Sequence, residues 1–345
     1  MHIPDGYLGP QTYLPAFAAM AGVWAVGLAR LKRTLRLRQV PLLALGAAFS
    51  FVIMLFNVPI PGGTSGHAVG TVLVAILFGP WAATVVVSLA IIVQAFLFGD
   101  GGILAIGANC LNMAVVCAFV GWGAYRLIAG RAPVASPRHW VGGAVGGYLG
   151  LVAAAVAAGV ELGLQPRLAH NADGQALYCP FGLSLTVPAM ALGHLLVFGF
   201  VEAAVSGLVV AYFQRTAPEM LAAAAPARPP VGLFPRLTVG LGLLVLLAPL
   251  GVILPAHFHA GPAWGEWSAA EVRQHGAAYV PSGLQAAEAH GWHAPLPDYA
   301  LPDHPVLRNL PSCALGAVGL ALLLLLMARP WARKEAPDVP PVVAD

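Results

Sequence analysis

The sequence predicts an all-α polytopic membrane protein: a bundle of seven helices, then two further transmembrane helices that flank an extracytoplasmic segment. Hydrophobic residues make up 59% of the 345 residues and charged residues only 9%, against about 25% in a soluble domain. The mean hydropathy is +0.80, and apolar runs of about 20 residues recur along the chain. Because no single soluble core could cover this much apolar surface, a soluble globular protein is excluded.

Nine apolar runs are predicted to cross the membrane. They are residues 8–29, 41–57, 67–79, 81–98, 103–128, 140–162, 184–213, 236–254 and 310–328. Gly79 and Pro80 separate the third run from the fourth, and a proline in the middle of one long helix would break it. We therefore predict two crossings between residues 67 and 98.

Lysine and arginine residues predict the orientation. With nine crossings and the amino terminus outside, 14 of the 17 cations lie inside, and the other three are Arg167, Arg273 and Arg308. Cytoplasmic loops are enriched in these cations. A single crossing at 67–98 would instead place the cations of residues 126–138 on the outer face, against this rule. We expect a multi-pass protein of the cell inner membrane. Its amino terminus and 57–66 loop share the outer face, and its carboxyl terminus is cytoplasmic.

The chain is predicted to contain two units joined by a linker. Residues 1–214 hold the first seven spans, and residues 215–235 are rich in alanine and proline, which is typical of a tether. Residues 236–345 contain two spans around an outer segment at 255–309. No cleavable signal peptide is expected, because the first cation, Arg30, follows the first apolar run.

The first two residues have the chemistry of a metal chelator. Met1 is expected to keep its free amine, because His2 is too large for methionine excision. That amine and the His2 amide nitrogen can close a five-membered ring on a metal, and the amide nitrogen and Nδ1 can close a six-membered ring. Three nitrogens then lie in a plane with one corner empty. Square-planar nitrogen ligation suits Ni(II) or Cu(II), whereas structural zinc prefers tetrahedral sites.

The loop at residues 57–67 supplies a candidate for the fourth corner. It reads NVPIPGGTSGH, with two prolines and three glycines before His67. Glycine allows tight turns and close approach of another segment. The predicted topology places this loop on the face of Met1 and His2, so the His67 imidazole could complete the square. The simpler interpretation is an exposed His2 and a His67 that caps the next helix at the membrane boundary.

These segments resemble a known family. The opening MHIPDGYLGP, the loop NVPIPGGTSGH, Gly99-Asp100-Gly101-Gly102, Gly107-Ala108-Asn109 and Asn112-Met113 are similar to the NikM/CbiM family. That family comprises the substrate-binding (S) components of energy-coupling-factor transporters for nickel and cobalt, and the resemblance covers about residues 1–214. It implies metal ligation by the amine of Met1, the amide and ring nitrogens of His2, and the ring of His67.

The second unit resembles the small partner of that component. Tyr279-Val280-Pro281-Ser282-Gly283-Leu284 looks like the partner's Pro-Asp-Gly-Leu motif, with Ser282 in place of the aspartate. The resemblance implies a fused NikN-like unit, and such a fusion favours nickel over cobalt. It also implies a transmembrane coupling (T) component and two cytoplasmic ATPases as partners, since the chain has no GxxxxGK[ST] motif of its own. No resident cofactor and no nucleic-acid partner are expected; Ni(II) or Co(II) is the transported ion.

Several polar residues in the apolar runs have two interpretations each. Gln94, Asn109 and Asn112 either donate hydrogen bonds beneath the metal or pair neighbouring helices. His194, with Glu202 two turns later, is either a functional intramembrane residue or a histidine bonded to a neighbouring helix.

Further candidates lie in the outer loops. Asp100 is expected to cap an outer turn rather than bind metal. The outer segment has six histidines, which either gather metal or belong to a plain polar surface: His257, His259, His275, His290, His293 and His304. The spacing of His290 and His293 would place them on one helix face. The four cysteines show no CxxC spacing, and Cys110 and Cys117 are expected in the core.

Other functions remain open at this point. The eleven histidines could belong to a haem-binding membrane enzyme or to a membrane metallohydrolase. Only His194 lies well inside a predicted span, whereas a haem-binding bundle needs histidines inside facing spans, and the sequence contains no HExxH motif of a metallohydrolase. A vitamin-binding S component would not need His2. A cobalt-specific importer that supplies cobalamin synthesis is the nearest alternative. We expect a transporter component and not an enzyme, one that captures Ni(II) or Co(II) at the outer face and passes it into the cell.

Overall fold

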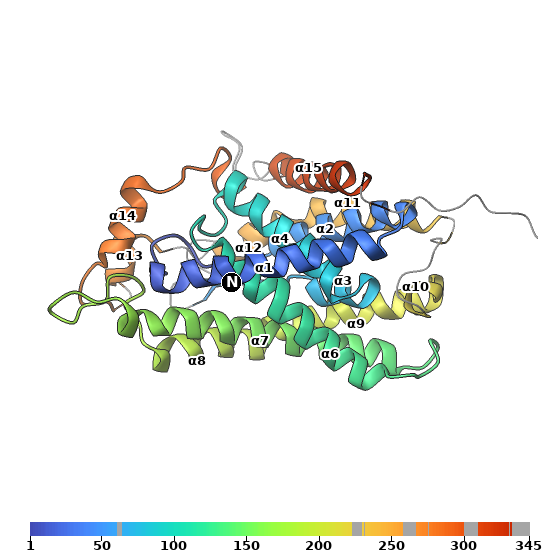
Figure 1. Cartoon of the computed structure of the whole chain (residues 1–345), viewed down its shortest axis with the longest axis horizontal. Coiled ribbons are helices and arrows are strands. Elements are labelled where there is room, and N and C mark those ends of the chain that lie inside the picture. Colours follow the sequence, from blue (N-terminus) through green and yellow to red (C-terminus); the bar gives the residue numbers. More distant parts are fainter. Residues whose placement is uncertain are drawn as a thin grey trace, which may run out of the picture.

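The chain folds into an elongated helical bundle. The structure is a computed structural model that describes residues 1–60, 64–222, 230, 232–257, 267–274, 276–299, 310–330 and 332. Most helices run along the long axis of the molecule, and the amino terminus lies among them rather than at one end (Figure 1). The predicted all-α polytopic membrane fold is confirmed.

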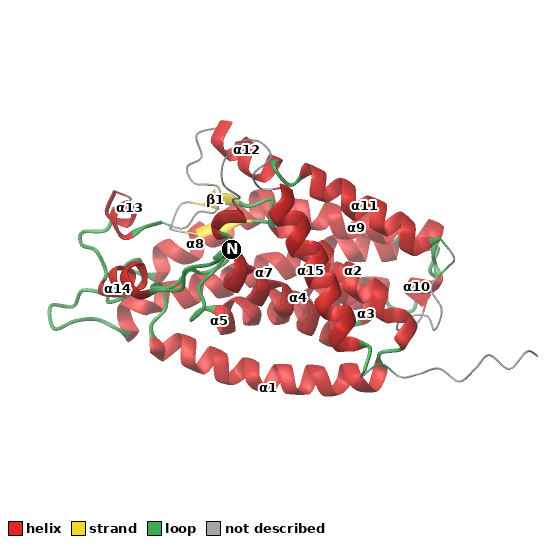
Figure 2. Cartoon of the chain, turned by 90° about the horizontal axis from the view of Figure 1, so that it is seen from above, coloured by secondary structure: helices red, strands yellow, loops and turns green. Residues whose placement is uncertain are grey.

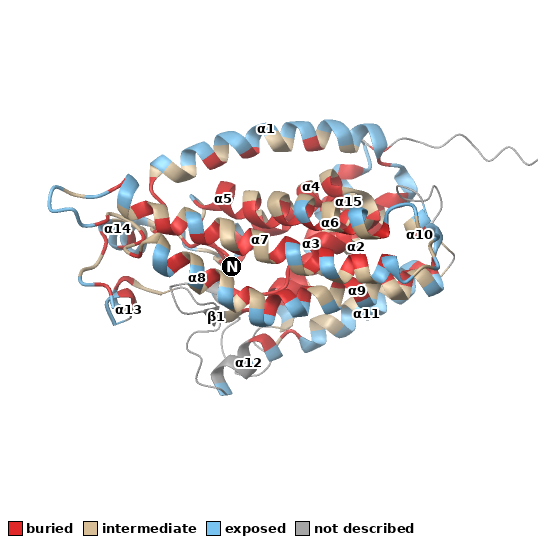
Figure 3. Ribbon diagram, turned by 90° about the horizontal axis from the view of Figure 1, so that it is seen from below, coloured by how far each residue is buried: buried red, intermediate tan, exposed pale blue. Residues whose placement is uncertain are grey.

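Within the described ranges, seven helices are long and apolar enough to cross a membrane. They are α1 (Pro10–Thr34); α2 (Val40–Met54) after a 3-10 turn (Leu37–Gln39); α4 (Pro80–Val93) with a π-helical end (Gln94–Phe98); α5 (Ile106–Cys110), a π-helical turn (Leu111–Val116) and α6 (Cys117–Ala129) in one run; α7 (Arg138–Leu168); α8 (Leu183–Gly193), a π-helical turn (His194–Phe198) and α9 (Gly199–Thr216) in one run; and α15 (Leu310–Ala328). Buried residues line their inner faces, and the outward faces are exposed (Figure 3).

The third predicted span, 67–79, is not one helix across the membrane. β1 (Val58–Ile60) and β2 (Thr64–Gly66) form an antiparallel hairpin, and α3 (Thr71–Phe78) has only eight residues. A helix of that length is about 12 Å long, against about 30 Å of hydrocarbon core. The predicted helix start at His67 is therefore wrong, because His67 lies in the stretch before the helix. Figure 2 shows β1 beside the amino terminus and α3 towards the opposite end of the bundle.

Glu202 of α9 helps to explain where α3 begins. Its carboxylate accepts hydrogen bonds from the backbone N–H groups of Val69 at 2.8 Å and Gly70 at 3.0 and 3.1 Å. A negative charge at a helix amino terminus pairs N–H groups that the helix leaves unpaired. Gly70 has a φ of 71°, which a residue with a β-carbon rarely adopts. Glu202 thus holds the backbone at the start of α3.

The chain still runs along the bundle and back again between residues 67 and 98, as the two predicted crossings require. Gly79, with a φ of 88°, reverses the chain between α3 and α4. The start of α4 lies beside the end of α1, where the Arg30 guanidinium is 4.7 Å from the Trp81 ring centroid. The other end of α4 leads to Asp100, which contacts His2. The chain therefore returns along α4 to the end of the bundle at which α1 begins.

The described helices after residue 232 pack along the preceding bundle. The apolar run predicted to span at 236–254 is not one continuous helix: α11 (Leu233–Leu247) ends before Pro249, and α12 (Leu250–His257) follows it. Both α11 and α15 pack against α2. A β-carbon at Gly316 of α15 would collide with a phenylalanine ring of α2, so glycine allows this close approach.

The remaining described helical elements are short. They are α10 (Glu219–Ala222), α13 (Ala269–Gln274), α14 (Ser282–His290) and a 3-10 turn (Pro297–Tyr299). Gly6 lies against α14: a β-carbon on Gly6 would be 2.8 Å from the carbonyl oxygen of Gly283. Residues 223–229 and 231 of the predicted linker lie outside the described residues.

Candidate metal site at the amino terminus

The first residues of the chain are buried. Met1 is 1% exposed and His2 2%. The side-chain amide of Asn109 forms two hydrogen bonds with the backbone of Ile3. Its Oδ1 accepts a hydrogen bond from the Ile3 N–H at 2.8 Å, and its Nδ2 donates to the Ile3 carbonyl at 3.1 Å. The Gly102 N–H donates to the same carbonyl at 3.0 Å. Asn109 therefore acts on the backbone beside His2.

The loop after α4 anchors the same segment. The Asp5 carboxylate accepts hydrogen bonds from the N–H groups of Ile103 at 3.0 Å and Leu104 at 2.8 Å. Burial raises the pKa of Asp5, and these two bonds oppose the increase. The segment from Met1 to Gly9 is thereby held at several backbone positions before α1 begins.

Gly101 lets this loop lie directly against His2. Its φ is 91°, and a β-carbon there would be 3.2 Å from the His2 Cβ and 3.1 Å from the Asn109 Nδ2. Both the backbone conformation and the available space favour glycine at this position. The loop could not approach His2 as closely with a larger residue.

The imidazoles of His2 and His67 are stacked. Their ring centroids are 4.9 Å apart and their planes meet at 27°. The His67 Nδ1 lies 3.0 Å from the Ala68 carbonyl oxygen, which can only accept, so Nδ1 carries the proton. The His67 Nε2 is then a buried lone-pair nitrogen with no hydrogen-bond partner in the described part of the chain. Such a nitrogen is suited to a metal ion.

His67 is also held in the protonation state that a metal needs. Burial, the positive amino terminus and His2 together lower the pKa of His67 well below its usual range. The ring therefore stays neutral at physiological pH, as a ligand must. The simpler interpretation of these two histidines is wrong: both are buried, and α3 begins only at Thr71.

The Asp100 carboxylate contacts His2 and does not take the capping role that was predicted for it. Its Oδ1 lies 2.8 Å from the His2 Nδ1, and its Oδ2 accepts a hydrogen bond from the Tyr299 hydroxyl at 3.0 Å. The Gln94 Nε2 donates to the same Oδ2 at 3.5 Å. Burial opposes ionisation of Asp100, but His2 and Tyr299 outweigh it, and the pKa of Asp100 lies below its usual range.

The contact with Asp100 bears on the predicted chelate. Nδ1 of His2 is the nitrogen that would close the six-membered ring, and here it faces the carboxylate. A metal bound through Nδ1 must therefore replace this contact. Asp100 was not predicted from the sequence to belong to the site. The sequence feature that could have indicated it is a lone carboxylate in the glycine-rich loop Gly99-Asp100-Gly101-Gly102.

The three predicted supporting amides take different positions. Asn109 binds the backbone next to His2, and Gln94 reaches His2 only through Asp100. Asn112 donates to the Glu161 carboxylate of α7 at 2.7 Å, as an interhelical pair. The structure thus places Asn109 and Gln94, but not Asn112, in this network.

His194 lies in the same region but makes a local bond. Its Nδ1 donates to the carbonyl of Met190, one turn earlier, at 2.7 Å. Its Nε2 is buried and has no hydrogen-bond partner within the described residues. Of the two interpretations of His194, a bond to a neighbouring helix is not observed in the described part of the chain, because the Met190 partner belongs to the same helical run.

The outer histidines do not form the predicted helix face. His290 is the last residue of α14 and His293 follows the helix end, so their spacing does not place them on one helical face. His259, His275 and His304 lie outside the described residues. In the described ranges, no group of three or more His, Cys, Asp or Glu side chains is placed to hold a metal. A site that takes two of its nitrogens from the backbone would not form such a group.

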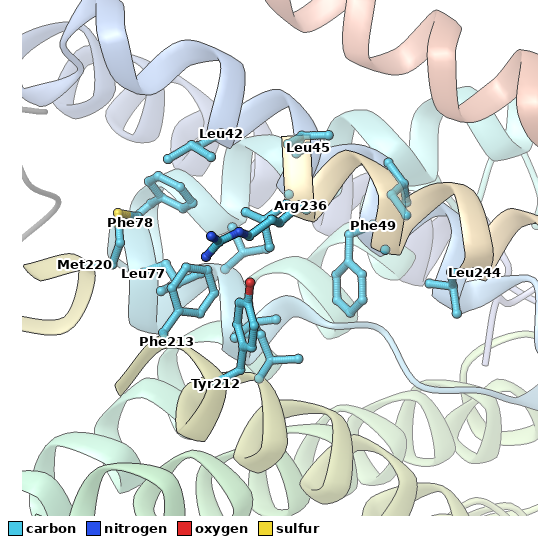
Figure 4. Close-up of a pocket in the computed structure, with 17 residues that line it drawn as sticks. Leu42, Leu45, Phe49, Leu77, Phe78, Tyr212, Phe213, Met220, Arg236 and Leu244 are labelled. Carbon is cyan, nitrogen blue, oxygen red and sulfur yellow. The ribbon is translucent and has the colours of Figure 1, made fainter. Parts of the chain in front are cut away.

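The cysteines and the apolar cavity offer no metal site. All four cysteines are free and buried, which confirms Cys110 and Cys117 as core residues. A cavity of about 420 Å³ lies between α2, α3, α9 and α11 (Figure 4). Its described lining is apolar apart from Tyr212 and Arg236, and it holds no imidazole, thiol or carboxylate.

Known proteins match this chain over its first part and over almost its whole length. Residues 2–220 match the family described as "Cobalt uptake substrate-specific transmembrane region" (CbiM). The fused nickel transport protein NikMN of Rhodobacter capsulatus is 47% identical, over 93% of this chain and 96% of its own. The probable fused nickel transport protein LarMN of Lactiplantibacillus plantarum is 44% identical, over 94% and 96%.

A solved structure matches part of this chain. A crystal structure of a truncated transition metal transporter is 51% identical, with a TM-score of 0.59, and the match covers 62% of this chain and 98% of that one. The chain therefore belongs to the CbiM family of substrate-specific transmembrane regions, and it is a metal-transport component rather than an enzyme.

Proposed function

We propose that this chain captures Ni(II) through the amine of Met1, the amide nitrogen and Nδ1 of His2, and the Nε2 of His67. The observation that carries the proposal is the stacked, buried pair of His2 and His67 at 4.9 Å, with a lone-pair nitrogen on His67. A four-nitrogen site requires Met1 and His2 to lie next to His67, which is 65 positions later in the sequence than His2. The buried amino terminus supports this convergence.

The four nitrogens define the chemistry of the site. A deprotonated amide, an amine and two imidazoles favour a square plane, and Ni(II) accepts that geometry. Only a strongly Lewis-acidic metal removes the amide proton, so weakly acidic Ca(II) and Mg(II), which prefer oxygen ligands, are excluded. Cu(II) satisfies the same ligands, so the test must include it.

Nickel is favoured over cobalt. The relatives that match almost the whole chain are named nickel transport proteins. Relatives named cobalt transport protein CbiM match only 39% and 37% of the chain. Cobalt remains the second candidate, because the family description itself names cobalt uptake.

We place the site on the outer side of the membrane. The distribution of lysine and arginine supports an amino terminus outside and a carboxyl terminus in the cytoplasm. The chain has no phosphate-binding GxxxxGK[ST] loop, so energy for import would come from other chains. A membrane-embedded coupling component and two cytoplasmic ATPases, as in energy-coupling-factor transporters, would drive release inward.

Replacement of His2 by glutamine tests the proposal. The variant loses the ring nitrogen but keeps the Met1 amine, because glutamine is also too large for methionine excision, so stoichiometric Ni(II) binding by the purified protein should be lost. The matched control is His170→Gln, at an exposed histidine bonded to its own loop. Unchanged binding by the first variant would overturn the ligand set. Competition among Ni(II), Co(II) and Cu(II) in the wild type would identify the preferred metal.

A further inference from the structure

One residue of the fused second unit reaches the proposed metal site. Tyr299 lies in the segment between α14 and α15, and its hydroxyl donates to Oδ2 of Asp100 at 3.0 Å. Oδ1 of the same carboxylate lies 2.8 Å from the His2 Nδ1. We propose that Tyr299 is a positioning residue that holds Asp100 as the counter-charge of the bound metal. The proposal rests on the function proposed above.

The charge of the site calls for such a group. A divalent ion with one deprotonated amide carries one net positive charge, and His2 and His67 are almost fully buried. A buried charge is costly unless an opposite charge pairs with it. Asp100 is the carboxylate that contacts His2 in the described part of the chain. When the metal takes Nδ1, the carboxylate remains beside the new positive charge.

Other buried or half-buried carboxylates bind other groups. Glu202 binds the backbone N–H groups before α3, and Glu161 accepts from Asn112. Asp5 binds two N–H groups of the loop after α4. Among these carboxylates of the described chain, Asp100 is the one that contacts His2.

Tyr299 is itself rigidly placed. Its ring is fully buried, stacks on Phe98 with centroids 4.3 Å apart and planes at 13°, and meets the Phe51 ring edge-on at 6.0 Å. Tyr299 has a φ of 57°, the single positive value among the described residues other than glycine. A non-glycine residue keeps this conformation only when its surroundings impose it. The hydroxyl is therefore directed at Asp100 by packing on both sides of the ring.

The segment that carries Tyr299 is bound to the end of α4. The Leu296 N–H donates to the Leu97 carbonyl at 2.9 Å, and the Trp292 Nε1 donates to the Phe96 carbonyl at 2.9 Å. These bonds are made to the last turn before the loop that contains Asp100. The second unit thus contacts the proposed metal site in two ways: it binds the end of α4 next to the Asp100 loop, and Tyr299 binds the Asp100 carboxylate. Tyr299 is a residue that the first unit does not supply.

The test compares two tyrosine hydroxyls of the second unit. In full-length protein, Tyr299→Phe should weaken Ni(II) binding by about tenfold or more, because it removes a hydrogen bond to a charged group. Tyr279→Phe is the matched control: the Tyr279 hydroxyl accepts from the Ala176 N–H at the same interface but does not contact Asp100. Its affinity should stay within about twofold of wild type. The melting temperature without metal should be similar in both variants.

A double-mutant cycle separates positioning from packing. Asp100→Asn should weaken Ni(II) binding at least as much as Tyr299→Phe, and the double variant should lose no more than Asp100→Asn alone. Additive losses, or wild-type affinity in Tyr299→Phe, would overturn the role of Tyr299 and leave the ligand set standing. Absence of stoichiometric Ni(II) binding in the wild type would instead overturn the proposed function.

Discussion

His2 and His67 stack with their ring centroids 4.9 Å apart, although one belongs to the segment before α1 and the other to the stretch before α3. The two segments enter the bundle separately and meet beneath the loop that carries Asp100. The hydrogen bonds of Asn109 and the cap by Glu202 hold the two backbones on either side of this contact. The stacked pair is therefore built by long-range packing, and the following predictions test its parts.

Replacement of His67 by alanine should reduce Ni(II) affinity without unfolding the protein. The change removes one proposed ligand, and loss of a residue that only supports a ligand already costs about 10–100-fold. We therefore expect a loss of at least about hundredfold, measured by competition with a chelator of known affinity. His170→Ala, at an exposed histidine bonded to its own loop, is the control. Normal affinity in His67→Ala would remove this ring from the site.

Replacement of Gly101 by alanine should weaken metal binding through crowding of His2. The alanine β-carbon would lie 3.2 Å from the His2 Cβ, and the backbone has a φ of 91°. Gly174→Ala is a matched control, because Gly174 has a φ of 77° but nothing within 4 Å of its added β-carbon. Both variants share a backbone cost of about 1–2 kcal/mol. Only Gly101→Ala should lower the Ni(II) affinity; equal effects would show that strain alone is responsible.

Asn109 and Asn112 should differ in their effect on the site. Asn109→Leu leaves the Ile3 N–H without its side-chain partner, at a cost of about 1–3 kcal/mol. The segment before α1 should then exchange its amide hydrogens faster, and Ni(II) affinity should fall. Asn112→Leu removes a bond to Glu161 and should leave the metal affinity near wild type. The reverse order of affinities would contradict the placement of these two amides.

Metal binding should weaken as the pH falls. The amine and the His2 amide must each lose a proton, so acid competes with the metal. Because the pKa of His67 lies well below its usual range, its ring stays neutral near pH 6 and does not add to the slope there. Affinity should fall by about tenfold or more per pH unit between pH 8 and pH 6, the consequence of at least one proton released on binding. Titration calorimetry in buffers of different ionisation heat counts these protons, and a pH-independent affinity would argue against the amine and amide as ligands.

Much of the architecture could be predicted from the sequence alone. Helices that cross a membrane need long apolar runs, and such runs are a local property of the chain, so most spans were found near their true limits. The resemblance of the opening residues and of the 57–67 loop identified the family. The candidate ligands at Met1, His2 and His67 were also named at this level, because amines and imidazoles in those motifs suggest nitrogen ligation.

Tertiary structure decided which polar groups meet. The loop before α3, the contact of Asp100 with His2, the pairing of Asn112 with Glu161 and the approach of Tyr299 all join segments far apart in the chain. Hydropathy reports how much of a helix is apolar, but it does not report which neighbour each face meets. A buried polar group must find a partner wherever the fold brings one within reach. The sequence determined the spans and the chemistry available at the amino terminus, and the packing of the bundle decided that His2 lies between His67 and Asp100.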